Sequence, residues 1–204
     1  LLESHLPVDD GCGLVVLNTK KSAFQAWREL RDRLDGPVLF LSRSMAPLHR
    51  RATLKRLKEL REIGCKHHLV ATQVVEAGVD LDFDWVYRDL GPLDSVIQVA
   101  GRCNRHLNPD VHGRVLVAEL RASNDRSFHS YVYSKILTLA TREILSRYRS
   151  FSEHEVPAMV DEYYKRILER IHTQNFFDND IRKGHWGSLP KLIEEQDFYE
   201  VTVF

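Results

Sequence analysis

The sequence lacks an excess of either charge, since its 204 residues carry 29 Lys and Arg against 29 Asp and Glu. Bulk charge therefore indicates no nucleic-acid partner, although charge segregated on one surface is compatible with this balance. The three cysteines show no Cys-x-x-Cys spacing, which argues against a disulfide framework or a zinc site and fits a reducing compartment. No apolar run approaches the ~20 residues of a membrane span, and the first residues do not resemble a signal peptide. We therefore expect a cytoplasmic protein without a membrane partner.

Short apolar runs alternate with segments of helical periodicity in the first part of the chain. The composition, with 43% hydrophobic and 28% charged residues, is that of an ordinary globular protein with one sizeable core. The predicted strands are 13–18, 38–42, 67–72, 85–90 and 114–120, and the predicted helices are 19–34, 48–63 and a segment from about Ser95 to Arg105. This alternation predicts an α/β fold with a parallel sheet covered by helices on both faces.

The pattern changes after about residue 122. Apolar stripes predict two consecutive helices over 130–148 and 156–171, without an intervening strand. The tail 173–204 carries mixed turn signals and a last strand at 199–204 as one reading. We therefore expect a linker at 1–12, an α/β domain at 13–122 and an α-helical C-terminal appendage at 123–204.

Polar side chains follow several of the predicted strands, where ligands of open α/β sheets bind. The stretch 71–84 is the richest. Thr72 and Gln73 are suited to hydrogen-bond a phosphate or a base, Gly78 permits a tight backbone path, and Asp80 can accept from a ribose hydroxyl. The competing reading is a metal site, because carboxylates at 80, 82 and 84 would share one face of a strand. No further ligands converge on these three, so we predict no metal site.

The stretch QVAGRCNRH at 98–106 is the second candidate site. Arg102 and Arg105 are three residues apart and would share one face of a helix, and Gly101 leaves the backbone before Arg102 uncovered. Taken alone, the two arginines fit a surface pair that bridges to an acid such as Asp94 better than they fit a ligand site. Cys103 lies beside both arginines, which predicts a lowered thiol pKa.

The segment VATQVVEAGVDLDFDWVYRDLGPLDSVIQVAGRCNRH at 70–106 resembles motifs V and VI of the second RecA-like domain of superfamily 2 helicases. More narrowly, it is similar to the signature helicase–nuclease of type I CRISPR systems, an antiviral defence protein. VVLNTKKSA at 15–23 resembles that family's motif IV, and LFLSRSM at 39–45 resembles its next block. The resemblance covers about 13–170 and implies a RecA-like sheet followed by a helical region.

The resemblance implies roles for the residues on the motif positions. Gln98, Arg102 and Arg105 fall where motif VI reaches the ATP phosphates, with Arg105 as the arginine finger and Arg102 beside it on the γ-phosphate. Gly78 and Asp80 fall on motif V, near the ribose. The positions implied to bind the single-stranded backbone are Thr19, Ser42, Arg43, Thr72 and Gln73.

The resemblance also implies ATP and Mg²⁺ as cofactors, held mainly by a first RecA-like domain that this chain does not contain. The sequence has no Gly-x-x-x-x-Gly-Lys-Ser/Thr, its one Asp-Glu pair lies inside a predicted helix at 161–162, and no His-Asp nuclease signature occurs. We therefore expect the C-terminal half of an ATP-dependent DNA helicase, inactive alone.

The implied partners are single-stranded DNA, the first RecA-like and nuclease domains of the same protein, and the RNA-guided CRISPR surveillance complex. Two alternatives remain open. One is another superfamily 2 DNA translocase, of restriction or repair. The other is a stand-alone nucleic-acid-binding module without ATPase activity.

Overall fold

The computed structural model describes residues 11–76, 78–106, 113–122, 125–148, 150–170 and 183. The strands are β1 (Gly13–Val16), β2 (Val38–Leu41), β3 (His68–Ala71), β4 (Trp85–Asp89) and β5 (Arg114–Ala118). The α-helices are α1 (Lys20–Arg31), α2 (Pro47–Glu62), α3 (Leu93–Ala100), α4 (Lys135–Arg147) and α5 (Val156–Arg170). Short 3₁₀ turns are η1 (Gln73–Val75), η2 (Phe128–Tyr131) and η3 (Glu153–Glu155).

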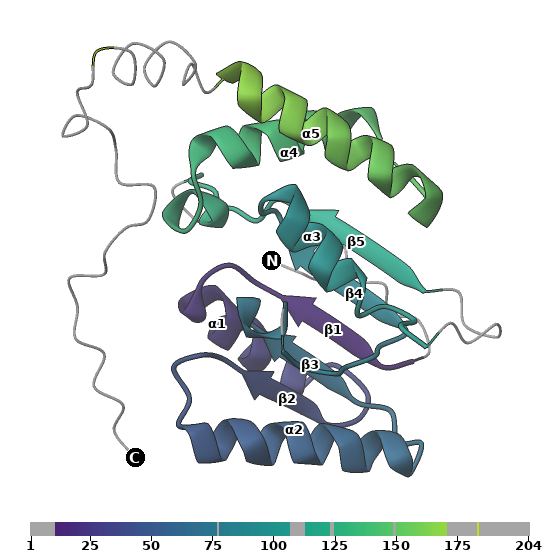
Figure 1. Ribbon diagram of the computed structural model, residues 1–204. Helices are drawn as coiled ribbons and strands as arrows, with labels where there is room; N and C mark the ends of the chain where they lie inside the picture. The colour runs from purple at the N-terminus through teal and green to yellow at the C-terminus, as the bar shows by residue number, and fades with distance from the viewer. Residues whose placement is uncertain are drawn as a thin grey trace.

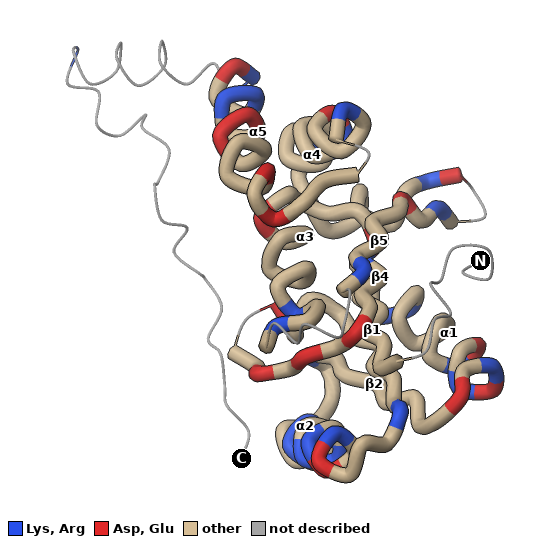
Figure 2. The backbone as a smooth tube through the Cα atoms, turned by 90° about the vertical axis from the view of Figure 1, so that its right-hand side faces the viewer, with Lys and Arg blue, Asp and Glu red and all other residues tan. Residues whose placement is uncertain are grey.

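The five strands form one sheet in the order β2-β3-β1-β4-β5, and every neighbouring pair is parallel. Helix α1 covers one face, while α2 and α3 cover the other (Figure 1). Figure 2 shows the sheet between these layers and the many Lys and Arg residues of α2. The predicted α/β fold with a parallel, doubly covered sheet is confirmed.

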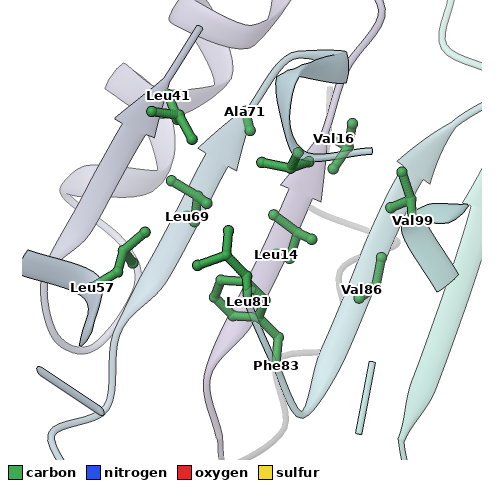
Figure 3. Packing of buried hydrophobic residues seen from close by; sticks show 11 residues of the cluster. Leu14, Val16, Leu41, Leu57, Leu69, Ala71, Leu81, Phe83, Val86 and Val99 are labelled. Carbon is green, nitrogen blue, oxygen red and sulfur yellow. The ribbon is translucent and has the colours of Figure 1, made fainter. Parts of the chain in front are cut away.

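Alternate residues of the strands supply the cores on the two faces of the sheet. Leu14, Val16, Leu69 and Val86 point towards α2 and α3, where Val99 and other buried side chains meet them (Figure 3). The intervening residues of the strands pack against α1 on the opposite face. Because both faces are covered, the strands are apolar almost throughout rather than alternating with polar residues.

Helices α4 and α5 form a pair that packs on α3. Leu93 at the start of α3 belongs to the same buried cluster as Ile144 of α4 and Tyr163 of α5. Glu143 of α4 joins the pair at the surface, because it accepts hydrogen bonds from Arg166 at 2.8 Å and from Arg170 at 2.6 Å. The predicted appendage of two consecutive helices is therefore present over 135–170, and it rests on the α/β layer.

Two predicted helices differ from the structure by more than the few residues seen at the ends of the other elements. The helix expected to reach Arg105 ends at Ala100, because Gly101 caps it and Cys103 is drawn into a bridge beside Phe83. The helix expected from 130 begins at Lys135, where the Ser134 hydroxyl accepts from the amide of Ile136 at 3.3 Å. The strand suggested at 199–204 and most of the linker at 1–12 lie outside the described residues. Within the described part, no helix is long and apolar enough to cross a membrane.

Candidate nucleotide and strand-binding site

The residues predicted to bind a nucleic-acid backbone gather at the carboxyl edge of the sheet. The hydroxyl of Thr19, after β1, accepts from the amide of Ser22 at 3.1 Å and so caps α1. Ser42, after β2, and Thr72, after β3, are buried, whereas the neighbouring Arg43 is exposed. The side chains at this edge therefore hold the loops in place, and Arg43 is the predicted residue most open to a ligand.

Gln73 ties two of these loops together. Its amide Nε2 donates to the main-chain carbonyl of Asn18 at 2.9 Å, which links the turn after β3 to the end of β1. The side chain is half-buried. The side-chain amide of Gln73 therefore binds the main chain of Asn18 in this structure, and it holds two loops of the sheet edge together.

The residues predicted to reach a nucleotide lie on the side of the sheet covered by α2 and α3. The Arg105 guanidinium forms an ion pair with Asp80 at 3.1 Å, and its backbone amide donates to Asp82 Oδ1 at 2.7 Å. Both partners of the ion pair are exposed, with 40% and 72% of their side-chain surfaces open. Gln98 is exposed on α3, and Gly78 adopts a positive φ of 76° in the loop before Asp80, as a tight path requires.

Arg102 points into the protein rather than outwards with Arg105. Its side chain is buried, with Nε donating to the carbonyl of Val75 at 3.2 Å and Nη2 to the carbonyl of Glu76 at 2.9 Å. The expectation that both arginines share one face of a helix is wrong, because α3 ends before either of them. In this structure Arg102 therefore holds the loop after β3, and Arg105 is the exposed cation of the pair.

The three carboxylates at 80, 82 and 84 all have partners within the chain, and Arg105 contacts both Asp80 and Asp82. Asp80 faces Arg105, Asp82 accepts from Arg61 at 2.6 Å, and Asp84 accepts from the backbone amide of Cys12 at 2.6 Å. Among the described residues, no group of three His, Cys, Asp or Glu side chains is arranged to hold a metal ion.

Cys103 differs from the prediction in its acidity. Burial raises the pKa of its thiol to about 11, and Asp82 and Asp84 add to this effect. The expected lowering by adjacent arginines is wrong, because neighbours in sequence are not its electrostatic neighbours in the fold.

A buried polar network behind the site was not predicted. Arg88, with none of its side chain exposed, donates from Nη1 to Asn18 Oδ1 at 2.7 Å and to the carbonyl of Asp89 at 2.8 Å. Asn18 in turn donates to Asp89 Oδ2 at 2.7 Å. The signal in the sequence was the charged pair Arg88–Asp89 inside the otherwise apolar run WVYRDL, since charges at such positions are seldom buried unless they are paired.

The contribution of Asp89 to the free energy of unfolding should fall as the pH rises from about 4 to about 6. Burial raises the pKa of Asp89 from its ordinary 3.8 to about 6, although the amide of Leu120 and the charge of Arg88 oppose this. Within that interval the folded chain holds a proton that the unfolded chain has released, so lower pH favours folding. The difference between the two values corresponds to ~3 kcal/mol.

Urea unfolding of the wild type and of Asp89→Asn over pH 4–7 measures this contribution. The comparison is needed because hydrogen bonds from Arg170 and Arg166 lower the pKa of Glu143 and Glu162, respectively. The contribution of such carboxylates to the free energy of unfolding decreases as the pH falls, which is opposite to the effect of Asp89. The difference between wild type and variant should change with pH between 4 and 6. Parallel curves would contradict the assignment to Asp89.

The comparisons with known proteins identify the family and the fold. The family model described as CRISPR-associated nuclease/helicase Cas3, C-terminal, matches residues 9–108. The chain belongs to the Cas3 nuclease/helicase family. The match contains the sheet-edge residues, the loop after β3 and both arginines, so the Cas3 family model covers the whole candidate site.

Individual Cas3 proteins are similar over most of the chain. The CRISPR-associated endonuclease/helicase Cas3 of Thermus thermophilus is 32% identical over 202 residues, which cover 86% of this chain and 21% of that protein. The Cas3 of Methanothermobacter thermautotrophicus is 27% identical over 193 residues, covering 92% of this chain and 22% of that protein. The chain thus spans about a fifth of the length of these relatives.

Solved Cas3 structures share the fold. The crystal structure of T. fusca Cas3-ATP superposes with a TM-score of 0.65 at 22% identity, over 86% of this chain and 22% of that one. A CRISPR RNA-guided surveillance complex in a pre-nicking state contains a chain with a TM-score of 0.63 at 24% identity, over 90% of this chain and 24% of that one. At these identities the likeness establishes the RecA-like fold of the Cas3 C-terminal region.

Proposed function

We propose that this chain is the second RecA-like half of an ATP-dependent motor that moves along single-stranded DNA in CRISPR interference. We assign residues 13–122 to the RecA-like domain and 123–204 to the region that follows it, in which α4 and α5 occupy Lys135–Arg147 and Val156–Arg170. The observation that carries the proposal is the path of the loop after β3. This loop begins among the residues predicted to bind single-stranded DNA at the sheet edge. It runs to the exposed Asp80–Arg105 pair on the side of the sheet that α2 and α3 cover.

The side chains on that side fit one half of a nucleotide site. Arg105 offers an exposed planar guanidinium that matches phosphate oxygens, and Asp80 offers an exposed carboxylate for ribose hydroxyls. An added Cβ at Gly78 would meet no atom within 4 Å, so a ligand has room to approach there. Bound ATP would supply the phosphoryl group whose transfer to water drives movement. Arg105 would then exchange Asp80 for the phosphates.

The rest of the nucleotide site belongs to the first RecA-like domain of the full-length protein. Mg²⁺ and the phosphate cradle would be held there, since the sequence has no P-loop and its Asp-Glu pair lies in α5. Closure of the two domains around ATP would bring Arg105 to the reacting phosphate. The same closure would shift the single-stranded DNA bound at the sheet edge. The surveillance complex would supply the displaced single strand, and a nuclease domain would receive it.

ATP hydrolysis by the full-length protein, measured with single-stranded DNA, double-stranded DNA or no nucleic acid, tests the proposal. Single-stranded DNA should increase turnover, and the isolated 204-residue chain should hydrolyse no ATP because half of the site is absent. A full-length protein that binds DNA but hydrolyses no ATP would instead favour a binding module. Stimulation by double-stranded DNA alone would favour a restriction or repair translocase.

A further inference from the structure

Arg88 is the centre of a buried hydrogen-bond network with arms in four parts of the fold. Its Nη1 binds the end of β1 through Asn18, as described above. The two N–H groups of its Nη2 are shared among three acceptors, which are Glu76 Oε1 at 3.1 Å, the Ser95 hydroxyl at 2.8 Å and the Tyr133 hydroxyl at 3.1 Å. These three partners belong to the loop after β3, to α3 and to the segment before α4. One guanidinium therefore contacts the end of β1, the loop after β3, α3 and the segment before α4.

Glu76 is held from two directions. Its carboxylate accepts from Ser95 at 2.6 Å and from Arg88, while its main-chain carbonyl accepts from Arg102. Burial raises the pKa of this carboxyl group, which the Ser95 hydrogen bond and the Arg88 charge oppose. Glu76 thus fixes the loop between Thr72, at the sheet edge, and Asp80, beside Arg105.

The contact with Tyr133 extends the network beyond the RecA-like layer. Tyr133 lies two residues before the start of α4, and α4 and α5 pack as a pair on α3. Its ring also lies near Gly91, where an added Cβ would be 3.3 Å from Cε2 of the ring. Displacement of the helical region would therefore change the partners of Arg88 directly.

We propose that Arg88 is a positioning residue that holds the loop after β3 against α3 and Tyr133. By holding this loop, Arg88 couples the binding of single-stranded DNA at the sheet edge to nucleotide chemistry at Arg105. This inference rests on the proposed function. The loop joins the DNA-binding residues predicted at the sheet edge to the Asp80–Arg105 pair. A shift at one end of the loop therefore reaches the other end only if the middle of the loop moves as a unit. Hydrogen bonds from Arg88, Ser95 and Arg102 give the middle of the loop that rigidity.

Loss of the Tyr133 contact would be a discrete step in this coupling. Tyr133 is one of three partners of Nη2, so its withdrawal leaves Arg88 paired with Glu76 and Ser95 rather than unpaired. The fold would survive such a change, while the direction of the Arg88 and Glu76 side chains would alter. Coupling carried by an element with two arrangements is the physical requirement for communication between distant sites.

Tyr133→Phe in the full-length protein tests the inference, because it removes one hydroxyl and keeps the ring. Tyr131→Phe is the matched control, since Tyr131 is exposed and its observed contact is the Arg126 guanidinium over its ring at 4.2 Å. Ser95→Ala is a second test, which removes a bond to Glu76 at the other end of the network. The measurements are basal and single-strand-stimulated kcat, KM for ATP, and the urea unfolding midpoint.

Tyr133→Phe and Ser95→Ala should lower the stimulated kcat relative to the basal kcat by roughly threefold or more, as expected for changes within a coupling network. KM for ATP should stay the same, the unfolding midpoint of Tyr133→Phe should match that of the control, and Tyr131→Phe should behave as wild type. Equal stimulation in wild type, Tyr133→Phe and Ser95→Ala would overturn the inference and leave the proposed function intact. A wild type without single-strand-stimulated hydrolysis would overturn both.

Discussion

Arg105→Ala should lower single-strand-stimulated ATP hydrolysis by the full-length protein by about 10³–10⁵-fold, the range known for arginine fingers. The reason is that the exposed guanidinium of Arg105 would be the group that stabilises charge on the transferring phosphoryl group. Stability should hardly change, because the ion pair of Arg105 with Asp80 is exposed and such pairs contribute ~0–1 kcal/mol. Turnover is measured at saturating ATP and DNA, and ATP binding is measured separately.

Two further variants sharpen this result. Arg105→Lys keeps the charge but lacks the planar fork, so we expect it to recover only a small part of the lost turnover. Arg28→Ala removes an exposed arginine from α1, on the opposite face of the sheet, and should hydrolyse ATP at the wild-type rate. An Arg105→Ala protein as active as Arg28→Ala would show that QVAGRCNRH does not supply the finger.

Arg88→Met should lower the free energy of unfolding of the chain by about 3–5 kcal/mol, the cost of removing one partner from a buried ion pair. Arg88 has no exposed side-chain surface, and the side chain of Glu76 is only 18% exposed. Methionine keeps the unbranched apolar stem of the lost side chain but removes the guanidinium that donates to Asn18, Ser95 and the Glu76 carboxylate. Urea unfolding of the 204-residue chain measures the loss.

A double-mutant cycle separates the ion pair from the packing. Glu76→Gln removes the charge of the partner and keeps an acceptor oxygen for Ser95. The double variant Arg88→Met/Glu76→Gln should therefore lose less stability than the sum of the two single variants. Arg56→Ala on α2, whose pair with Glu59 is exposed, should leave the unfolding midpoint unchanged. Additive losses in the cycle would show that Arg88 stabilises through its other partners instead.

Local patterns predicted the elements well, for reasons that particular residues make clear. Pro47 begins α2 because its missing amide hydrogen is not needed in the first turn, and Thr19 begins α1 because its hydroxyl accepts from Ser22. The apolar runs became strands buried on both faces, as their lack of alternation indicated. Where prediction was wrong, the cause was a distant contact: the bridge between Phe83 and Cys103 draws the chain away from the axis of α3.

The candidate site was predicted as a set of residues but not as an arrangement. Motif spacing identified Arg102 and Arg105 together, yet only Arg105 is exposed, because Arg102 meets the carbonyls of Val75 and Glu76. Neither the inward direction of Arg102 nor the raised pKa of Cys103 follows from adjacent residues. Both depend on what a different element places beside them.

The sequence by itself determined the succession of strands and helices, the parallel sheet and, to within one or two residues, where each strand ends. These properties follow from periodicity and capping over a few neighbouring residues. Only the tertiary structure decided the strand order β2-β3-β1-β4-β5 and the burial of Arg88 among its partners. The physical reason is separation along the chain, since Arg88 and Asn18 are 70 residues apart and meet at 2.7 Å only because β1 and β4 are neighbours in the sheet.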